Sequence, residues 1–386
     1  MSLVSRFYNW QYEIRQAWVG AIFRIRTPRP TVAPPVPENP RRVLLVLSGL
    51  IGDTVLSTSL IIEARRVWPQ ARLAVLGRAR NCALLHDCPL VDEFIETSVD
   101  PFALVRRPDV GALRLRLKDA GFEIAVIALG DQFASLLYEV GIPVRVGVKG
   151  HWLQPCLTHT YEIRDGHGWG PNDRLGALRA LGYHTQPAPP TLWASRQTSD
   201  GAMGRLLEHG LPAGQRFMVF HPFGSSWIKY WPMDRVKEVA DRIWEQKGLY
   251  CVIVGGPETV GRVEPGLGAS IVDSTGRLSL QELTGVIADA ELVVSSDSGP
   301  FHMAGALGVP LVGMFRTQAP EHAGYYPQAR TIFGSHPDCA GHCEWNRCDW
   351  QPCRQMLSLD SQTVLDAIAA LGRQPAGQEK EGLQYA

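Results

Sequence analysis

Several features that would assign a chain to a common class are missing from this sequence. Its 38 lysines and arginines equal its 38 aspartates and glutamates, so the formal net charge is zero. A general nucleic-acid binder relies on a large basic field and is therefore disfavoured. No uninterrupted apolar run approaches the roughly 18 residues that a membrane-spanning helix needs. Glu13 and Arg15 interrupt the apolar residues of 10–23, so a signal-peptide core is missing as well. We expect a cytoplasmic protein with no nucleic-acid partner.

A secreted disulfide framework is missing too. The 386 residues include only eight cysteines, at scattered spacing. Four of them nevertheless gather near the end, at steps of four, five and five residues, whereas structural zinc sites usually contain C-x-x-C pairs. Two interpretations stay open: a structural zinc or iron site, with His336 and His342 as further ligands, or reduced cysteines that pack the returning tail. The four cysteines are Cys339, Cys343, Cys348 and Cys353.

The first 40 residues differ from the rest. Apolar residues recur at helical spacing over 1–27, with arginines among the polar positions. This helix either lies on a membrane surface or packs on the protein's own body. Residues 28–40 follow as a stiff proline-rich linker.

From residue 41 the chain alternates apolar strands with helical patterns, and this alternation restarts after the prolines of 187–190. Unbroken apolar strands between helices predict doubly wound parallel sheets, so we expect an α/β fold with two units of similar size and ligands at the strand ends. The predicted domains are 41–190 and 191–372, the second with a Cys-rich segment at 339–353, followed by a polar tail at 373–386. The predicted strands are Val43–Leu47, Leu73–Leu76, Ile124–Leu129, Arg145–Gly147, Phe217–His221, Tyr250–Gly255, Leu292–Ser295 and Leu311–Met314. The predicted helices are Asp53–Val67, Val110–Ala120, Gln132–Val140, Asp234–Gln246, Ser279–Ala288 and Pro300–Leu307.

The turn after the first strand is glycine-rich, at Ser48–Thr54. It lacks the G-x-G-x-x-G fingerprint of dinucleotide sites, which disfavours a nicotinamide enzyme. Asp53 stands at the expected start of the helix and has two interpretations. It is either a plain helix cap or a general base that takes a proton from an attacking hydroxyl.

Two further polar segments follow strands of the second unit. In residues 221–232, Ser225 and Ser226 can donate hydrogen bonds to phosphate oxygens, and Lys229 offers a positive charge to a diphosphate. The alternative for Lys229 is a solvated loop lysine. In Gly255-Gly256-Pro257-Glu258, Glu258 is either a ribose contact or an exposed loop residue.

The most informative segment is Ser295–Pro310, a strand end, a polar elbow and a helix that opens near Pro300. Such an elbow presents free backbone N–H groups and the positive end of a helix dipole, which suits a phosphate or pyrophosphate. Asp297, Ser298, Gly299 and His302 are the candidate contacts, although a histidine in a first helical turn is often only a satisfied structural residue.

These segments, in order and local sequence, resemble glycosyltransferase family 9, the ADP-heptose:lipopolysaccharide heptosyltransferases, over roughly residues 41–370. The resemblance rests on the Asp-Ser-Gly-Pro-x-His-x-Ala-x-Ala-Leu-Gly-x-Pro run and on the early Gly-Asp turn. It implies a GT-B fold, with the acceptor on the first domain and the sugar nucleotide on the second. It also implies inverting transfer that requires no cofactor.

The resemblance assigns roles by position. Asp53 matches the catalytic base and Lys229 the residue that neutralises the leaving diphosphate. The matching donor contacts are Ser225, Ser226, Glu258, Leu278, Asp297, Ser298, Gly299 and His302. The implied partners are ADP-heptose and a lipid-linked glycan acceptor at the cytoplasmic face of the inner membrane, where the amphipathic N-terminus fits a peripheral contact.

The family's anionic acceptor gives the arginines of the first unit a possible role. Arg106 and Arg107, with Arg114, Arg116 and Lys118, suit its carboxylates and phosphates. The alternative is an ordinary charged helix face. Other functions also stay open: a different nucleotide sugar, a protein acceptor, or a catalytically silent sugar-nucleotide binding protein.

Overall fold

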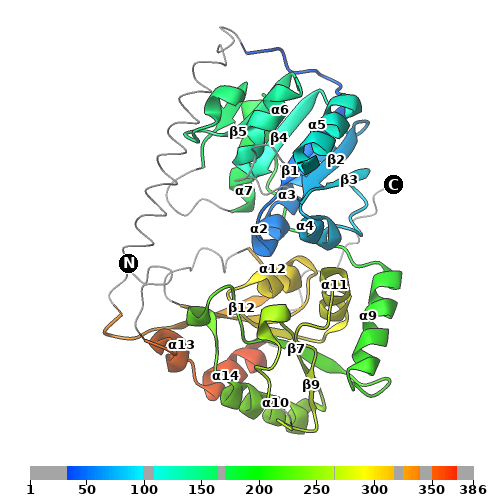
Figure 1. Ribbon diagram of the computed structural model, residues 1–386. Helices are drawn as coiled ribbons and strands as arrows, with labels where there is room; N and C mark the ends of the chain where they lie inside the picture. The colour runs from blue at the N-terminus through cyan, green and yellow to red at the C-terminus, as the bar shows by residue number, and fades with distance from the viewer. Residues whose placement is uncertain are drawn as a thin grey trace. The chain divides into compact units, whose positions relative to one another are not determined.

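The computed structural model describes residues 33–98, 108–163, 170–264, 266–316, 325–339 and 350–371 (Figure 1). Its contacts divide the chain into two compact units. The first contains Met1–Gly201 and Ser279–Gly285, and the second contains Ala202–Leu278 and Val286–Ala386. Within the described ranges, no helix is long and apolar enough to cross a membrane. The predicted N-terminal helix of 1–27 and the polar tail of 373–386 lie outside the described residues.

The first unit contains a six-stranded sheet in the order β3-β2-β1-β4-β5-β6. All neighbouring strands run parallel. The chain thus starts in the middle of the sheet, builds one half outward and then returns to build the other, as in a doubly wound Rossmann-type sheet. The strands are β1 Arg42–Leu47, β2 Arg72–Gly77, β3 Glu93–Glu96, β4 Ile124–Leu129, β5 Val144–Val148 and β6 His159–Tyr161.

Helices cover the first sheet because its strands are apolar on both faces. Every side chain of Val43–Leu47 is fully buried. Alternate residues such as Leu44 and Val46 pack against Leu113 of α5 and Leu137 of α6 in one core cluster. The helices that begin in this unit are α2 Ile51–Leu56, α3 Thr58–Val67, α4 Ala79–Leu84, α5 Pro108–Ala120, α6 Ala134–Glu139, α7 Pro171–Arg174, α8 Gly176–Ala180, α9 Arg196–Glu208 and α11 Leu280–Asp289.

The second unit repeats this topology. Its sheet has the order β12-β11-β10-β7-β8-β9, with parallel neighbours throughout. Met218 and Phe220 of β7 pack in one cluster with Val239 of α10 and Val364 of α14. The strands are β7 Phe217–His221, β8 Tyr250–Ile253, β9 Ile271–Asp273, β10 Val293–Ser296, β11 Leu311–Arg316 and β12 Ala329–Gly334. The helices that begin in this unit are α10 Met233–Lys247, α12 Gly299–Ala306, α13 Arg354–Ser358 and α14 Ser361–Leu371, and the end of α11 also belongs to it.

The predicted α/β fold with two doubly wound sheets is confirmed, and every predicted strand is present. Some bounds were wrong. The single predicted helix Asp53–Val67 is two helices that meet at Ser57, whose hydroxyl donates to the Asp53 carbonyl. The predicted strand Tyr250–Gly255 ends at Ile253, since Gly255 already belongs to the loop before a short 3₁₀ helix at Pro257–Thr259.

Candidate active site

The first unit changes winding direction between β1 and β4, which are paired through Val43–Ile124 and Leu45–Val126. In such sheets ligands bind outside the carboxyl ends of the two strands where the order reverses. Here the chain leaves β1 through Ser48, whose backbone N–H donates to the Leu129 carbonyl at 3.1 Å. It leaves β4 through Gly130 at φ +96°, a conformation that favours glycine. The glycine turn that leads to Asp53 therefore starts at the switch point of the sheet.

Asp53 is the third residue of α2, not its cap. The helix begins at Ile51 after Leu50, which provides no side-chain cap. The interpretation of Asp53 as a helix cap is therefore wrong, because α2 begins at Ile51, two residues before Asp53. The side chain of Asp53 is 30% exposed, and Oδ1 lies 3.5 Å from Nη2 of Arg174. Asp53 is thus a partly accessible carboxylate with one cationic partner.

Arg174, on the short helix α7, was not found by the sequence analysis. Its side chain is 3% exposed, and its Nη1 donates to the Gly170 carbonyl at 3.5 Å. A buried guanidinium is stable only beside compensating groups, and Asp53 supplies one. No motif surrounds Arg174, so only the tertiary fold reveals this pair.

Asp131 was missed as well, although its position offered a signal. It lies two residues after β4, at the strand end where site residues of this fold gather. Burial raises the pKa of the Asp131 carboxyl to about 6, although a backbone hydrogen bond to Val148 acts in the opposite direction. The charge of Asp131 also contributes to the raised pKa of Tyr161, mainly a burial effect, and Arg174 opposes that rise. Asp131 and Arg174, the ion-pair partner of Asp53, therefore both interact electrostatically with Tyr161.

The second unit changes direction between β7 and β10, and this switch point holds Lys229. The lysine ends the 3₁₀ helix Trp227–Lys229 and is only 8% exposed. Its Nζ lies 2.7 Å from Oδ2 of Asp297 and donates to the Asp297 carbonyl at 3.0 Å. The interpretation of Lys229 as a solvated loop lysine is therefore wrong. The strand-end loops of β7 and β10 meet in this ion pair.

The lack of a side chain at Gly224 allows Lys229 to take up this position. A Cβ added at Gly224 would lie 2.7 Å from the Cβ of Lys229, which is closer than two such carbons approach. The absence of a side chain at this position allows the loop to fold tightly over itself. Ser225 is exposed and Ser226 is half-buried in the same loop, so both hydroxyls belong to the surroundings of the ammonium.

The polar elbow after β10 has the predicted form. Ser298 is the N-terminal flanking residue of α12, and the helix begins at Gly299 with Pro300 second. The Ser298 hydroxyl donates to the Ser296 carbonyl at 2.9 Å. His302 is 6% exposed, and its Nδ1 lies 3.2 Å from the Tyr326 hydroxyl. This contact matches the structural interpretation of His302, whereas Asp297 and Gly299 are half-buried at the helix entrance.

The loop that carries Glu258 lies beside the lysine loop. A Cβ at Gly255 would come within 3.0 Å of the Phe223 ring, and a Cβ at Gly256 would lie 2.5 Å from the Glu258 carboxylate. The Gly276 N–H donates to the Gly255 carbonyl at 2.9 Å, and half-buried Leu278 follows two residues later. The structure thus brings all the predicted donor-binding segments of the second unit together.

Of the buried polar atoms that have no hydrogen-bond partner among the described residues, three lie at the carboxyl ends of the strands that form the two switch points. They are Oγ of Ser48 after β1, Nδ1 of His221 at the end of β7 and Oγ of Ser296 at the end of β10. Burial lowers the pKa of His221 to about 3, so its imidazole is neutral near pH 7. Buried polar groups without partners are rare and need an explanation. All three flank the two switch points, as expected for positions that a polar ligand reaches.

Several predicted site residues fall outside the described part of the chain. Arg106 and Arg107 do, as do Cys343 and Cys348. Of the remaining basic candidates, Arg114 pairs with Glu139 at 2.7 Å and Arg116 with Glu93 at 3.3 Å, as an ordinary charged helix face would. Cys339 is half-buried, and Cys353 is 1% exposed within the apolar core of the second unit. The metal site stays a prediction.

Two doubly wound α/β units with polar residues at the strand ends have the architecture of the GT-B fold. Solved structures share this fold. The glycosyl transferase family 9 protein from Veillonella parvula is 17% identical with a TM-score of 0.72, and the alignment covers 86% of this chain and 97% of that one. The ADP-heptose lipopolysaccharide heptosyltransferase II of Escherichia coli is 20% identical with a TM-score of 0.68, covering 86% and 98%.

The sequence comparison defines the family. The model of glycosyltransferase family 9 (heptosyltransferase) matches residues 110–351, and the chain belongs to this family. Lipopolysaccharide heptosyltransferase 1 of Pseudomonas aeruginosa is 25% identical over 333 residues, which cover 82% of this chain and 90% of the relative. Lipopolysaccharide heptosyltransferase 2 of Escherichia coli K12 is 27% identical over 301 residues, covering 72% and 84%. The protein is a heptosyltransferase-like glycosyltransferase enzyme.

Proposed function

We propose that this enzyme transfers a heptose from ADP-heptose to a lipopolysaccharide core acceptor, with inversion at the anomeric carbon. The observation that carries the proposal is the buried Lys229–Asp297 pair at the switch point of the second unit. A lysine ammonium held in place at 8% exposure is prepared to meet a diphosphate, because its orientation is already fixed before the ligand arrives. Relatives named as lipopolysaccharide heptosyltransferases support the choice of sugar and acceptor.

The donor site proposed here uses the three loops that meet in the second unit. Residues 298–299 of the elbow offer backbone N–H groups at the start of an eight-residue helix, where phosphate oxygens are favoured, whereas the Asp297 N–H already donates to the Met314 carbonyl at 3.1 Å. Ser225 and Ser226 add hydroxyl donors, and the exposed carboxylate of Glu258 suits ribose hydroxyls. Leu278 supplies an apolar contact for the base.

The transfer step proposed here assigns one role to each unit. The Asp53 carboxylate takes the proton of an acceptor hydroxyl while that oxygen forms a bond to the anomeric carbon of the heptose. The bond between this carbon and the diphosphate oxygen breaks, and ADP leaves with the electron pair. Lys229 stabilises the negative charge that develops on the diphosphate. Attack from the face opposite the leaving group inverts the anomeric configuration.

The location and the acceptor belong to the same proposal. We place the enzyme in the cytoplasm, in peripheral contact with the inner membrane that carries a lipid-linked acceptor. A different nucleotide sugar or a protein acceptor would use the same two switch points. These alternatives are distinguished by the donor and acceptor that support turnover.

Calorimetric titration of the full-length protein tests the donor. We expect ADP-heptose to bind and UDP-, GDP- and dTDP-sugars to bind at least about tenfold more weakly, with the ADP-heptose affinity lost in Lys229→Ala. Arg205→Ala, an exposed helix arginine paired with Glu208, serves as the control that keeps wild-type affinity. Tighter binding of another nucleotide sugar would overturn the heptose assignment while leaving the family unchanged.

A further inference from the structure

Asp131 is a carboxylate at the switch point of the first unit for which the proposed transfer step has no role. It lies two residues after β4, the neighbour of the strand that leads to Asp53. Its side chain is half-buried, and among the residues that the structure describes it has no cationic partner. A backbone hydrogen bond from Val148, at the end of β5, favours its charged form. A carboxylate accepts several hydrogen bonds, so Asp131 can still bind a group that donates one.

The end of β1 contributes a hydroxyl beside this carboxylate. A Cβ added at Gly130 would lie 3.2 Å from the Cβ of Ser48, so the two strand ends are in contact next to Asp131. Ser48 is 9% exposed, and its Oγ has no hydrogen-bond partner in the described part of the chain. A buried hydroxyl without a partner is rare, and this one can both donate to a ligand and accept from it.

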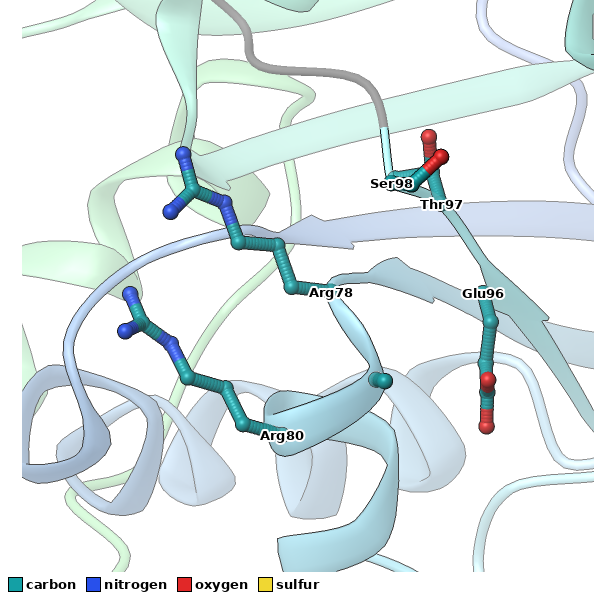
Figure 2. A pocket seen from close by; sticks show the side chains of 6 residues that line it. Arg78, Arg80, Glu96, Thr97 and Ser98 are labelled. Carbon is teal, nitrogen blue, oxygen red and sulfur yellow. The ribbon is translucent and has the colours of Figure 1, made fainter. Parts of the chain in front are cut away.

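The turn between Ser48 and Asp53 is held from both sides. On the β4 side, a Cβ added at Gly49 would lie 2.7 Å from Cδ1 of Leu129, so the turn packs closely on the strand end. On the β2 side, Arg80 at the start of α4 lines a pocket of about 500 Å³, and its Nη2 donates to the Gly49 carbonyl at 3.1 Å (Figure 2). A group bound by Ser48 is therefore held at a defined position relative to Asp53.

A buried tyrosine connects the surroundings of the two carboxylates. The Tyr161 hydroxyl donates to the Ile127 carbonyl at 3.3 Å and lies within electrostatic range of both Asp131 and Arg174. Since Arg174 lies 3.5 Å from the Asp53 carboxylate, Asp131 belongs to the same end of the sheet as the candidate base.

We propose that Asp131 and Ser48 bind one hydroxyl of the acceptor sugar, other than the hydroxyl that attacks, and so select acceptors by an uncharged group. This inference rests on the proposed function and adds a specificity determinant to it. The Asp131 carboxylate accepts the hydrogen of that hydroxyl in a charge-assisted bond, while the Ser48 hydroxyl donates to its oxygen. Such a site rejects an acceptor without the hydroxyl, because its own polar groups then stay unpaired.

Acceptor kinetics of the full-length enzyme at saturating ADP-heptose test the proposal. The acceptors are a lipopolysaccharide core acceptor without heptose and its monodeoxy forms, each of which lacks one non-attacking hydroxyl of the acceptor sugar. The enzymes are wild type, Asp131→Asn and Ser48→Ala. Asp119→Asn, at an exposed aspartate of α5, is the control for a lost carboxylate. Ser361→Ala is the control for a lost buried hydroxyl, because Oγ of Ser361 in α14 also lacks a partner among the described residues.

We expect Asp131→Asn to raise the KM of the complete acceptor about tenfold or more, with kcat changed far less. One monodeoxy acceptor should raise the wild-type KM by a similar factor, and its KM should be nearly the same for wild type and Asp131→Asn. Ser48→Ala should show the same pattern with the same acceptor, at a factor of about three or more. An equal increase in KM for every acceptor, or no increase, in either variant would overturn the proposal.

Failure of the proposed function has a different signature, in which wild type forms no heptosylated product with any of these acceptors. Calorimetric titration of the same acceptors without ADP-heptose then decides about Asp131. Wild-type binding that weakens at least about tenfold in Asp131→Asn, and by a similar factor with one monodeoxy form, supports the hydroxyl site. Equal binding to both proteins, or no binding to wild type, would refute it.

Discussion

Nη2 of the buried Arg174 lies 3.5 Å from Oδ1 of the partly exposed Asp53. The two residues come from helices α7 and α2, far apart in the sequence, and meet at the switch point of the first sheet. A carboxylate that acts as a base must point one oxygen at the acceptor hydroxyl. Arg174 restricts the rotation of this carboxylate, and we regard it as the residue that positions Asp53.

Replacement of Arg174 tests that role. We expect Arg174→Ala to lower kcat at least about tenfold and to leave the ADP-heptose affinity within about twofold, because the proposed donor site lies in the second unit. Added guanidinium should restore part of the rate, which a merely destabilised protein would not show. Arg114→Ala removes an exposed ion pair with Glu139 and serves as the control. An unchanged kcat in folded Arg174→Ala would contradict the role.

Gly224 tests the preorganisation of Lys229. A Cβ at this position would lie 2.7 Å from the Lys229 Cβ, so Gly224→Ala must displace the lysine. We expect calorimetry to show ADP-heptose binding weakened about tenfold or more, with the fold retained. Gly204→Ala is the matched control, since nothing lies within 4 Å of its added Cβ in helix α9. Wild-type affinity in Gly224→Ala would show that the exact place of the ammonium is unimportant.

Asp131 predicts a pH-dependent stability. Burial raises its carboxyl pKa from 3.8 to about 6, so the native state binds more protons than the unfolded state between these values. The free energy of unfolding of the wild type therefore falls as the pH rises from about 4 to 6 and stays lower above pH 6. Asp131→Asn avoids the cost and should be more stable at pH 8, by at most about 3 kcal/mol, because a partly exposed carboxylate is also solvated.

Thermal unfolding at pH 8 and pH 4 measures this difference. The midpoint of Asp131→Asn should exceed that of wild type at pH 8, and the gap should shrink toward pH 4, where the wild-type carboxyl is protonated. Asp119→Asn, at an exposed aspartate of α5, is the matched control for the removal of a carboxylate. A gap independent of pH would rule out a raised carboxyl pKa as its cause.

We expect glycosyl transfer to need no metal ion, since the proposed mechanism has Lys229 neutralise the charge of the leaving diphosphate. Dialysis against a chelator should leave the initial rate of transfer unchanged. Elemental analysis of the same samples tests a separate prediction, that the cysteine cluster holds a structural zinc or iron. Cys82→Ser is the control, because this cysteine lies in the first unit, outside the cluster. A rate that falls on chelation and returns with a divalent ion would contradict metal-independent transfer.

The central strands could be predicted because strands buried on both faces read as continuous apolar runs, as in Val43–Leu47. Edge strands could not. Residues 93–96 and 329–334 form β3 and β12, which mix polar and apolar residues because one side of each is partly exposed. Short helices such as α7 were missed for lack of a full apolar stripe.

The residues of the candidate site likewise fall into two groups, those that the sequence predicted and those that it did not. Asp53, Lys229 and Asp297 lie in the segments that follow β1, β7 and β10, so the rule that ligands bind at strand ends found them. Arg174 carries no motif, and only its tertiary contact with Asp53 places it at the candidate site. Asp131 could have been found by the same strand-end rule, since it follows β4 almost directly.

The most direct test of the account is the rate of heptose transfer by Asp53→Asn. Wild type and variant are incubated with ADP-heptose and a lipopolysaccharide core acceptor that lacks heptose, and product is followed by mass spectrometry. We predict product from wild type, a rate at least about 100-fold lower in the variant, and equal ADP-heptose affinity in both. Wild-type rates of transfer by folded Asp53→Asn would contradict the assignment of Asp53 as the base.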